Sequence, residues 1–259
     1  MRALVRFSSF LFLLVLALPG CRKGADPALA LSFQKAIQAF REAKTREEYL
    51  LVAAGLEDIL KTGVPSAALY YDLGNAFARA GEKGRAVAAY RQALRLRPRD
   101  PYFRNNLRLT QGSSPSLDGR KKTLLDNLVF WEAWLSQGEL AWLAAGLGLA
   151  AFLISLGVLV RPQSITLRRL RWFFLLLVLV AGASYLLQTR EQAPGRHGVL
   201  LHGKVEARTG DSETYEPAFA DPLPAAAEFE VIEERGSWLH IRLPSGPEGW
   251  VKQKDAVIY

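Results

Sequence analysis

The sequence predicts a multidomain protein that combines an all-α helical-repeat part, a two-helix transmembrane hairpin and a small C-terminal all-β barrel. Three observations predict this: a 34-residue helical pattern, two long apolar runs, and alternating apolar and polar residues near the C-terminus. Half of the 259 residues are apolar and 22% are charged, which excludes a disordered tail. The single cysteine excludes an internal disulfide framework and a cysteine-rich zinc site.

The formal charge of +8 is unevenly distributed along the chain. Residues 21–137 hold 19 basic and 12 acidic residues, whereas residues 191–259 hold 7 basic and 12 acidic ones. A basic helical part and an acidic C-terminal part are therefore expected. The acidic part is expected to face the basic part, either of the same chain or of another copy.

Residues 1–20 have the pattern of a secretory signal peptide. Arg2 and Arg6 precede an apolar stretch over residues 7–18, which is too short to span a bilayer. The following Leu18-Pro19-Gly20-Cys21 resembles a bacterial lipobox, with Pro19 in place of the commoner small residue. That resemblance implies a lipoprotein-type signal with Cys21 as the lipidation site; an ordinary signal peptide or an uncleaved anchor is the alternative.

Residues 21–110 are predicted to form helical repeats. The 34 residues 67–100 resemble one tetratricopeptide (TPR) repeat, and helical patterns at about 28–43 and 46–61 form a weaker repeat before it. Gly81 falls in the turn between the paired helices, and Pro101 suits the first turn of a closing helix. The TPR resemblance implies a groove that binds peptides or helices of other proteins. The positions that match the TPR signature are Tyr70, Leu73, Gly74, Phe77, Ala86, Tyr90, Ala93 and Pro98.

Residues 111–137 are predicted to connect the helical part to the membrane. Residues 111–123 have the composition of a linker, and 124–136 place Leu124, Leu128, Trp131 and Leu135 on one helical face. This helix is expected either in the membrane interface or packed on the TPR module. A dense basic stretch lies earlier in the chain. It is interpreted as a contact for anionic lipid or for an acidic partner, and the alternative is a solvated helix face. Its arginines are at 91, 95, 97, 99, 104 and 108.

Two apolar segments, 138–160 and 172–189, are predicted to be transmembrane helices. The connecting loop 161–171 carries Arg161, Arg168, Arg169 and Arg171 and no acidic residue, so the positive-inside rule makes it cytoplasmic. Both flanking parts are then extracytoplasmic, as the signal peptide independently predicts. This topology, a multi-pass protein of the bacterial cytoplasmic (inner) membrane, excludes nucleic acid as a partner.

Residues 190–259 are predicted to form short strands around 204–208, 228–232, 237–243 and 248–251. Val205–Gly210 and Val231–Val251 resemble the bacterial SH3 family, although Ala226 stands where a glycine is common. The resemblance implies an SH3-like barrel, and some family members bind cell-wall peptides. Tyr215, Trp238 and Trp250 are candidates for such a ligand groove; alternatively, the tryptophans complete a small core.

No catalytic, metal-binding or cofactor-binding constellation is found in the sequence. His197, His202 and His240 lack cysteine neighbours, and no nucleophile elbow, HExxH motif or complete dinucleotide fingerprint is present. The sequence therefore predicts a protein that is not an enzyme and has no cofactor.

The order of these parts resembles the BatE-type proteins of the Bacteroides aerotolerance (Bat) operon. The run from Ser66 to Asp100 looks like the well-formed repeat of that family. The resemblance implies a membrane-bound interaction subunit that accompanies von Willebrand factor A-domain membrane proteins and a MoxR-type ATPase, in an aerotolerance or envelope-stress complex. The alternative hypothesis is an anchor that binds peptidoglycan through the SH3-like domain.

Overall fold

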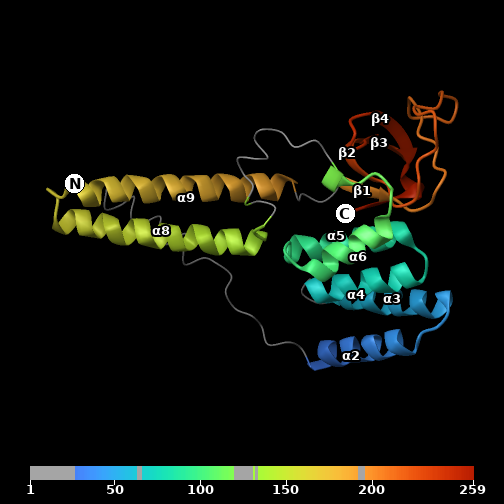
Figure 1. The fold of residues 1–259 in the computed structure, drawn as a ribbon, viewed down its shortest axis with the longest axis horizontal. Coiled ribbons are helices and arrows are strands. Elements are labelled where there is room, and N and C mark those ends of the chain that lie inside the picture. The colour runs from blue at the N-terminus through green and yellow to red at the C-terminus, as the bar shows by residue number, and fades with distance from the viewer. Residues whose placement is uncertain (1–26, 63–65, 120–130, 132–133, 192–195) are drawn as a thin grey trace. The chain divides into compact units, whose positions relative to one another are not determined.

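A computed structural model describes residues 27–62, 66–119, 131, 134–191 and 196–259. These residues contain seven α-helices and a five-stranded antiparallel sheet, so the predicted combination of a helical part with a small β domain is found (Figure 1). The chain divides into two compact units. One holds the two long apolar helices, and the other holds the remaining helices together with the sheet.

Five antiparallel helices form the helical part of the second unit (Figure 1). The predicted segments 28–43 and 46–61 are found as the first two of them, α2 and α3. The TPR-like segment forms α4 and α5, and Pro101 begins α6. The bounds are α2 Pro27–Glu42, α3 Arg46–Thr62, α4 Ala67–Arg79, α5 Lys83–Leu96 and α6 Pro101–Gln111.

The pairing of α4 with α5 depends on two glycines. Gly81 lies in the turn with φ of +80°, a left-handed conformation that glycine adopts without steric cost. Gly74 lies against the Tyr90 ring, because a Cβ at position 74 would be 2.5 Å from Tyr90 Cε1. The Tyr90 hydroxyl in turn donates a 2.8 Å hydrogen bond to the Asn75 side chain. The small residue at 74 therefore lets the two helices approach closely.

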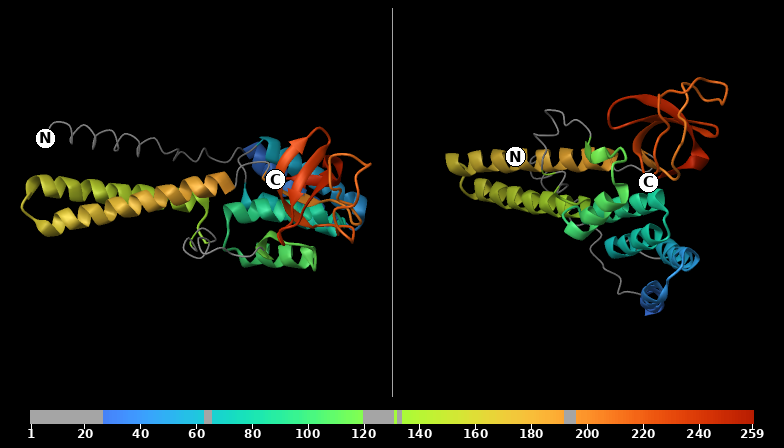
Figure 2. Two further views of the ribbon diagram at one scale, coloured as in Figure 1. Left: turned by 90° about the horizontal axis from the view of Figure 1, so that it is seen from above. Right: turned by 45° about the vertical axis from the view of Figure 1, so that its right-hand side comes forward.

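The sheet has the strand order β4-β3-β2-β1-β5, and all its neighbouring strands are antiparallel. Its bounds are β1 His197–Leu200, β2 Glu228–Arg235, β3 Trp238–Arg242, β4 Glu248–Lys252 and β5 Ala256–Ile258. The connection 201–227, drawn in orange beside the sheet, reaches β4 through main-chain hydrogen bonds between Arg208 and Trp250 (Figure 2). The predicted strand 204–208 is wrong as a regular strand, because it makes only isolated bridges.

Ala226, where a glycine was expected, adopts the left-handed conformation with φ of +62°. Its N–H donates to the Leu200 carbonyl, and its side chain is fully buried. The turn therefore keeps a backbone geometry typical of glycine and places a methyl group in the core.

The helical part and the sheet share one hydrophobic core. Val199, Ala226 and Tyr259 of the β part belong to the same buried cluster as Val87 and Tyr90 of α5. The segments predicted as a TPR domain and an SH3-like domain therefore pack together in one compact unit. A second cluster, which includes Phe229, Leu239, Ile241 and Val251, fills the interior of the sheet itself.

The other unit contains α8 Gln137–Val160 and α9 Ile165–Glu191, which pack against each other as an antiparallel hairpin (Figure 1). Both helices are long and apolar enough to cross a membrane, and only 11% of the most apolar stretch of each helix is buried. The second helix begins at Ile165 rather than at Trp172. Arg168, Arg169 and Arg171 therefore lie in the first turns of α9 and not in a loop, because an arginine-rich sequence continues a helix readily.

Replacing Gly74 with alanine is expected to destabilise the α4–α5 pair by about 1–3 kcal/mol, because the new methyl group displaces the Tyr90 ring. Hydrogen exchange of the full-length protein in detergent should show faster exchange of α4 and α5 amides. The matched control is Gly55→Ala in α3, where nothing lies within 4 Å of the added Cβ. That variant should exchange no faster than the wild type, and equal behaviour of the two variants would contradict the close approach at Gly74.

Candidate functional site

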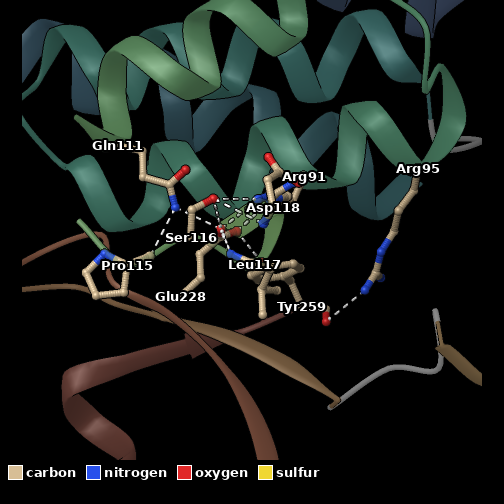
Figure 3. Close-up of polar contacts among 9 residues, drawn as sticks. All are labelled: Arg91, Arg95, Gln111, Pro115, Ser116, Leu117, Asp118, Glu228 and Tyr259. Atoms are coloured by element: carbon tan, nitrogen blue, oxygen red, sulfur yellow. Dashed lines mark hydrogen bonds and ion pairs between the residues drawn. The ribbon is translucent and has the colours of Figure 1, made fainter. Parts of the chain in front are cut away.

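A buried carboxylate joins the helical part to the sheet. Glu228, the first residue of β2, is fully buried, and Arg91 of α5 approaches it with both Nε (2.5 Å to Oε1) and Nη2 (2.6 Å to Oε2) (Figure 3). The two residues are 137 positions apart in the chain. The acidic C-terminal part thus does face the basic helical part, and it does so within one chain.

Further donors complete the surroundings of Glu228. The Gln111 amide donates at 2.8 Å, the Leu117 N–H at 3.0 Å, the Ser116 hydroxyl at 3.2 Å and the Tyr259 hydroxyl at 2.8 Å. A buried charge is tolerated only when it is paired and hydrogen-bonded in this way. We call this set the Glu228 junction; it consists of Arg91, Gln111, Ser116, Leu117, Glu228 and Tyr259.

The charge states at the junction follow from burial and pairing. Burial alone raises the pKa of the Glu228 carboxyl, but the hydrogen bonds and positive charge of Arg91, with Gln111 and Leu117, lower it to about 2. Burial also raises the pKa of the Tyr259 phenol well above its ordinary value, and the Glu228 charge adds to this. The junction therefore contains an ionised carboxylate, a guanidinium ion and a neutral phenol at neutral pH.

Residues 111–119, predicted to begin a linker, form an ordered strap across the junction. The Pro115 carbonyl accepts the Glu228 N–H at 2.9 Å, and the Ser114 hydroxyl donates to the Ala225 carbonyl at 2.8 Å. A short 3-10 turn at Leu117–Gly119 then brings Asp118 to within 2.9 Å of Arg91. The linker prediction is wrong for this stretch, because its polar groups bond to the β part instead of to water.

Gly84, near the start of α5, gives the second close contact between helix and sheet. A Cβ at this position would lie 2.4 Å from the Leu200 carbonyl oxygen and 2.8 Å from Leu201 Cα. These are main-chain atoms of β1 and the residue after it, so they cannot move aside as a flexible side chain can. Only glycine at 84 allows α5 to lie this close to β1.

The candidate ligand-groove residues have different environments. Trp250 is only 8% exposed, and its ring stacks on the His240 imidazole at 4.7 Å and lies 5.0 Å from the Arg235 guanidinium carbon. Trp238 is half-buried beneath the Lys252 ammonium, whereas Tyr215 is 49% exposed. Trp250 therefore packs against its neighbours, as the alternative interpretation holds, whereas Tyr215 remains open to solvent.

The loop that carries Tyr215 is tied to the sheet by two ion pairs. Asp211 pairs with Arg235 at 3.2 Å, and Glu213 pairs with Lys252. The Tyr215 ring also packs against Gly210, where a Cβ would be 2.6 Å away. These contacts hold the loop against the strands that bear the tryptophans.

The TPR signature positions lie in the helices α4 and α5 and just beyond α5. Leu73, Gly74, Phe77, Ala86, Tyr90 and Ala93 are buried, whereas Tyr70 and Pro98 are half-buried. Phe103 of α6 stacks on Tyr71 at 4.7 Å, so the closing helix continues the same packing. The six buried residues therefore belong to the core of the helical part, and none of them offers a binding surface.

A groove opens at the other edge of the helical part, between α2 and α3. Its volume is about 680 Å³, and it is lined by small and apolar residues with charged side chains among them. The TPR resemblance implies a groove for peptides or helices, but the sequence did not predict that a groove lies between α2 and α3. The lining includes Leu29, Lys35, Ala36, Ala39, Glu42, Ala43, Glu48, Leu51, Val52, Gly55, Asp58 and Ile59.

Polar contacts gather at the end of the apolar hairpin where α8 begins, and Arg161, Arg168, Arg169 and Arg171 lie at the other end. Ser136 and Glu139 form a capping box at the start of α8, and Gln188 of α9 donates to the Leu135 carbonyl at 2.9 Å. Trp131 donates to the Ser184 hydroxyl at 3.1 Å. Arg161 follows the last residue of α8, close in sequence to the arginines that begin α9.

Three predicted features fall outside the described residues: the signal peptide 1–20, Cys21, and most of the predicted helix 124–136. Within the described ranges, no group of three or more His, Cys, Asp and Glu residues is placed to hold a metal ion. His197 stacks loosely on Tyr259, His202 is exposed and His240 stacks on Trp250. Comparison with protein-family models, curated proteins and solved structures gave no match.

Replacing Glu228 with glutamine is expected to weaken the junction at neutral pH and to change its response to acid. The pKa of Glu228 is lower in the folded protein than its ordinary 4.5, so ionisation stabilises the fold above pH 4.5 and this contribution disappears as pH falls from 4.5 through 2. Its size is about 3 kcal/mol. Melting temperatures of the full-length protein across this pH range should show a smaller acid effect in Glu228→Gln, whereas Glu234→Gln, an exposed change on the same strand, should follow the wild type. Parallel acid profiles of Glu228→Gln and wild type would refute the role of the ionised carboxylate.

A methyl group at Gly84 is expected to separate α5 from β1 at a cost of about 1–3 kcal/mol, because main-chain atoms block it. In Gly84→Ala, hydrogen exchange should accelerate in β1 and in the strap, while α3 and α4 amides stay protected. Lys83→Ala, at the exposed neighbouring position, is the control and should leave all these amides unchanged. Unaltered exchange in Gly84→Ala would contradict the contact.

Proposed function

We propose that this protein is a non-enzymatic scaffold, anchored in the bacterial cytoplasmic membrane, that binds other proteins through its TPR-like helical module. The observation that carries the proposal is the open groove between α2 and α3. Its occupant is an amphipathic helix or an extended segment of a partner protein.

The shape of the groove suits a helix. Ala36 and Ala39 of α2 and Gly55 of α3 are small, so the backbone of a bound segment can approach both helices closely. Leu51, on the same face of α3, is 75% exposed and offers an apolar anchor point. Burying such a side chain contributes about 1.5–3 kcal/mol to binding before the cost of association is subtracted.

The charges of the groove favour a basic flank on the bound segment. Its lining carries the carboxylates Glu42, Glu48 and Asp58 and the single ammonium group of Lys35. Hydrogen bonds from the main-chain N–H groups of Lys44 and Thr45 lower the pKa of the Glu48 carboxyl, so this group is ionised at neutral pH. Charge complementarity of this kind sets register and excludes wrong partners more than it adds affinity.

The two apolar helices provide the membrane anchor in this proposal. The arginines that follow α8 and begin α9 support a cytoplasmic location of that end of the hairpin, by the positive-inside rule. The TPR-like and SH3-like parts are then extracytoplasmic, and lipidation of Cys21 would add a second anchor. The partners are membrane proteins, for which the BatE resemblance suggests von Willebrand factor A-domain proteins and a MoxR-type ATPase system.

Filling the groove tests the proposal. Gly55→Phe places a ring in space where nothing lies within 4 Å of the Cβ, so the fold should be retained while the groove is blocked. We expect photo-crosslinks from a benzophenone residue at position 51, in intact membranes, to a defined membrane protein. Those crosslinks should fall roughly tenfold in Gly55→Phe, as loss of about 1.4 kcal/mol implies.

Glu57→Phe is the matched control, because Glu57 is exposed on α3 and does not line the groove. It should leave crosslinking from position 51 unchanged. Equal crosslinking in Gly55→Phe and wild type would overturn the groove proposal. Binding of the full-length protein to purified peptidoglycan, with no crosslinked protein, would favour the wall-anchor alternative instead. The isolated β part is unsuitable for that experiment, because it would leave Glu228 without Arg91 and Gln111.

A further inference from the structure

The outward surface of α6 is an amphipathic face with its own chemistry. Helical spacing places Arg104 and Arg108 on one flank, Asn105 in the middle, and Leu109 and Tyr102 on the other flank. All five are exposed, with Tyr102 at 72% and Leu109 at 69%. We call these five residues the α6 outer face.

This face and its surroundings are positively charged. The helix α6 contains no acidic residue, and Asp100 just before it caps the helix by accepting the N–H groups of Tyr102 and Phe103. The exposed Arg97 and Arg99 precede that cap. Arg91 and Arg95 of the same basic stretch are turned to the β part, where Arg95 donates to the main-chain oxygen of Tyr259 at 3.2 Å. The predicted basic surface is therefore divided: two arginines bind the sheet, and the others remain outside that contact.

A cationic flank beside exposed aromatic and aliphatic side chains suits the interface of an anionic bilayer. Arginine pairs with lipid phosphates, while tyrosine and leucine enter the boundary between headgroups and acyl chains. The same chain holds two helices that are long and apolar enough to span a membrane. Residues 192–195 alone lie between α9 and the described β part, which is joined to α5 by the Glu228 junction. A bilayer is thus the surface that the chain itself brings within reach.

We propose that the α6 outer face docks on the anionic lipid headgroups of the membrane in which α8 and α9 lie. The arginines supply attraction to the headgroup phosphates, and Tyr102 and Leu109 supply the apolar contact. This docking rests on the membrane anchoring of the proposed function but not on the α2–α3 groove, which lies on other helices, so lipid docking and groove binding can fail separately.

The test uses the full-length protein in lipid nanodiscs. A fluorophore sensitive to polarity is attached at position 105 in the variant Asn105→Cys, with Cys21→Ser removing the only native cysteine. In discs of equal phosphatidylcholine and phosphatidylglycerol, we expect blue-shifted emission and quenching by brominated lipids. Both signals should weaken at high ionic strength and in discs of phosphatidylcholine alone, because the attraction is electrostatic.

Charge reversal separates lipid docking from other causes. The double variant Arg104→Glu and Arg108→Glu should reduce the docked population roughly tenfold or more. The control reverses the same number of charges at the end of α2 and just after it, with Arg41→Glu and Lys44→Glu, and should retain the lipid signal. Circular dichroism checks that each variant retains its fold, and the salt titration of the wild type tests the electrostatic attraction without a mutation.

Two results would overturn the proposal. One is a position-105 signal that is the same in anionic and neutral discs. The other is quenching that requires two copies of the protein in a disc, which would assign the α6 outer face to a protein partner such as the acidic β part of another copy.

Discussion

The Arg91–Glu228 ion pair is the interaction on which the rest of this structure depends. A carboxylate buried without partners would be costly, and here the cost is offset by the guanidinium, the Gln111 amide, the Leu117 N–H and two hydroxyls. These donors come from α5, the end of α6, the strap and the last described residue. The ion pair therefore determines both the position of the sheet against the helices and the path of the strap across them.

This constraint turns two expected modules into one body and decides which surfaces stay free for other molecules. Gly84 brings the β1 backbone against α5, and Tyr259 extends the helical core into the β part. The sheet consequently lies against α5, and α2 and α3 lie at the opposite edge of the helical part (Figure 1). The residues of α2 and α3 line the groove. The proposed protein binding at the groove and the proposed lipid contact at α6 are compatible with each other, because they use different helices of one compact unit.

Sequence patterns predicted well those features that depend on residues close together in the chain. Helical periodicity gave α2 to α5 within a few residues, and hydropathy gave both long apolar helices. The patterns failed where distant segments decide. The linker-like residues 111–119 are ordered by hydrogen bonds to Ala225 and Glu228, and the strand expected at 204–208 makes only isolated bridges.

The sequence by itself determined the helical hairpin around Gly81, the small residue needed at Gly74, the two apolar helices, and the opposite charges of the helical and β parts. Only the tertiary structure decided which of the acidic residues in the β part is buried, and that Arg91 rather than another arginine meets it. The reason is physical: the net charges of the helical and β parts, which composition gives, predict a general attraction between them. A buried pair between residues 137 positions apart depends instead on the docking geometry, because every donor must reach one carboxylate.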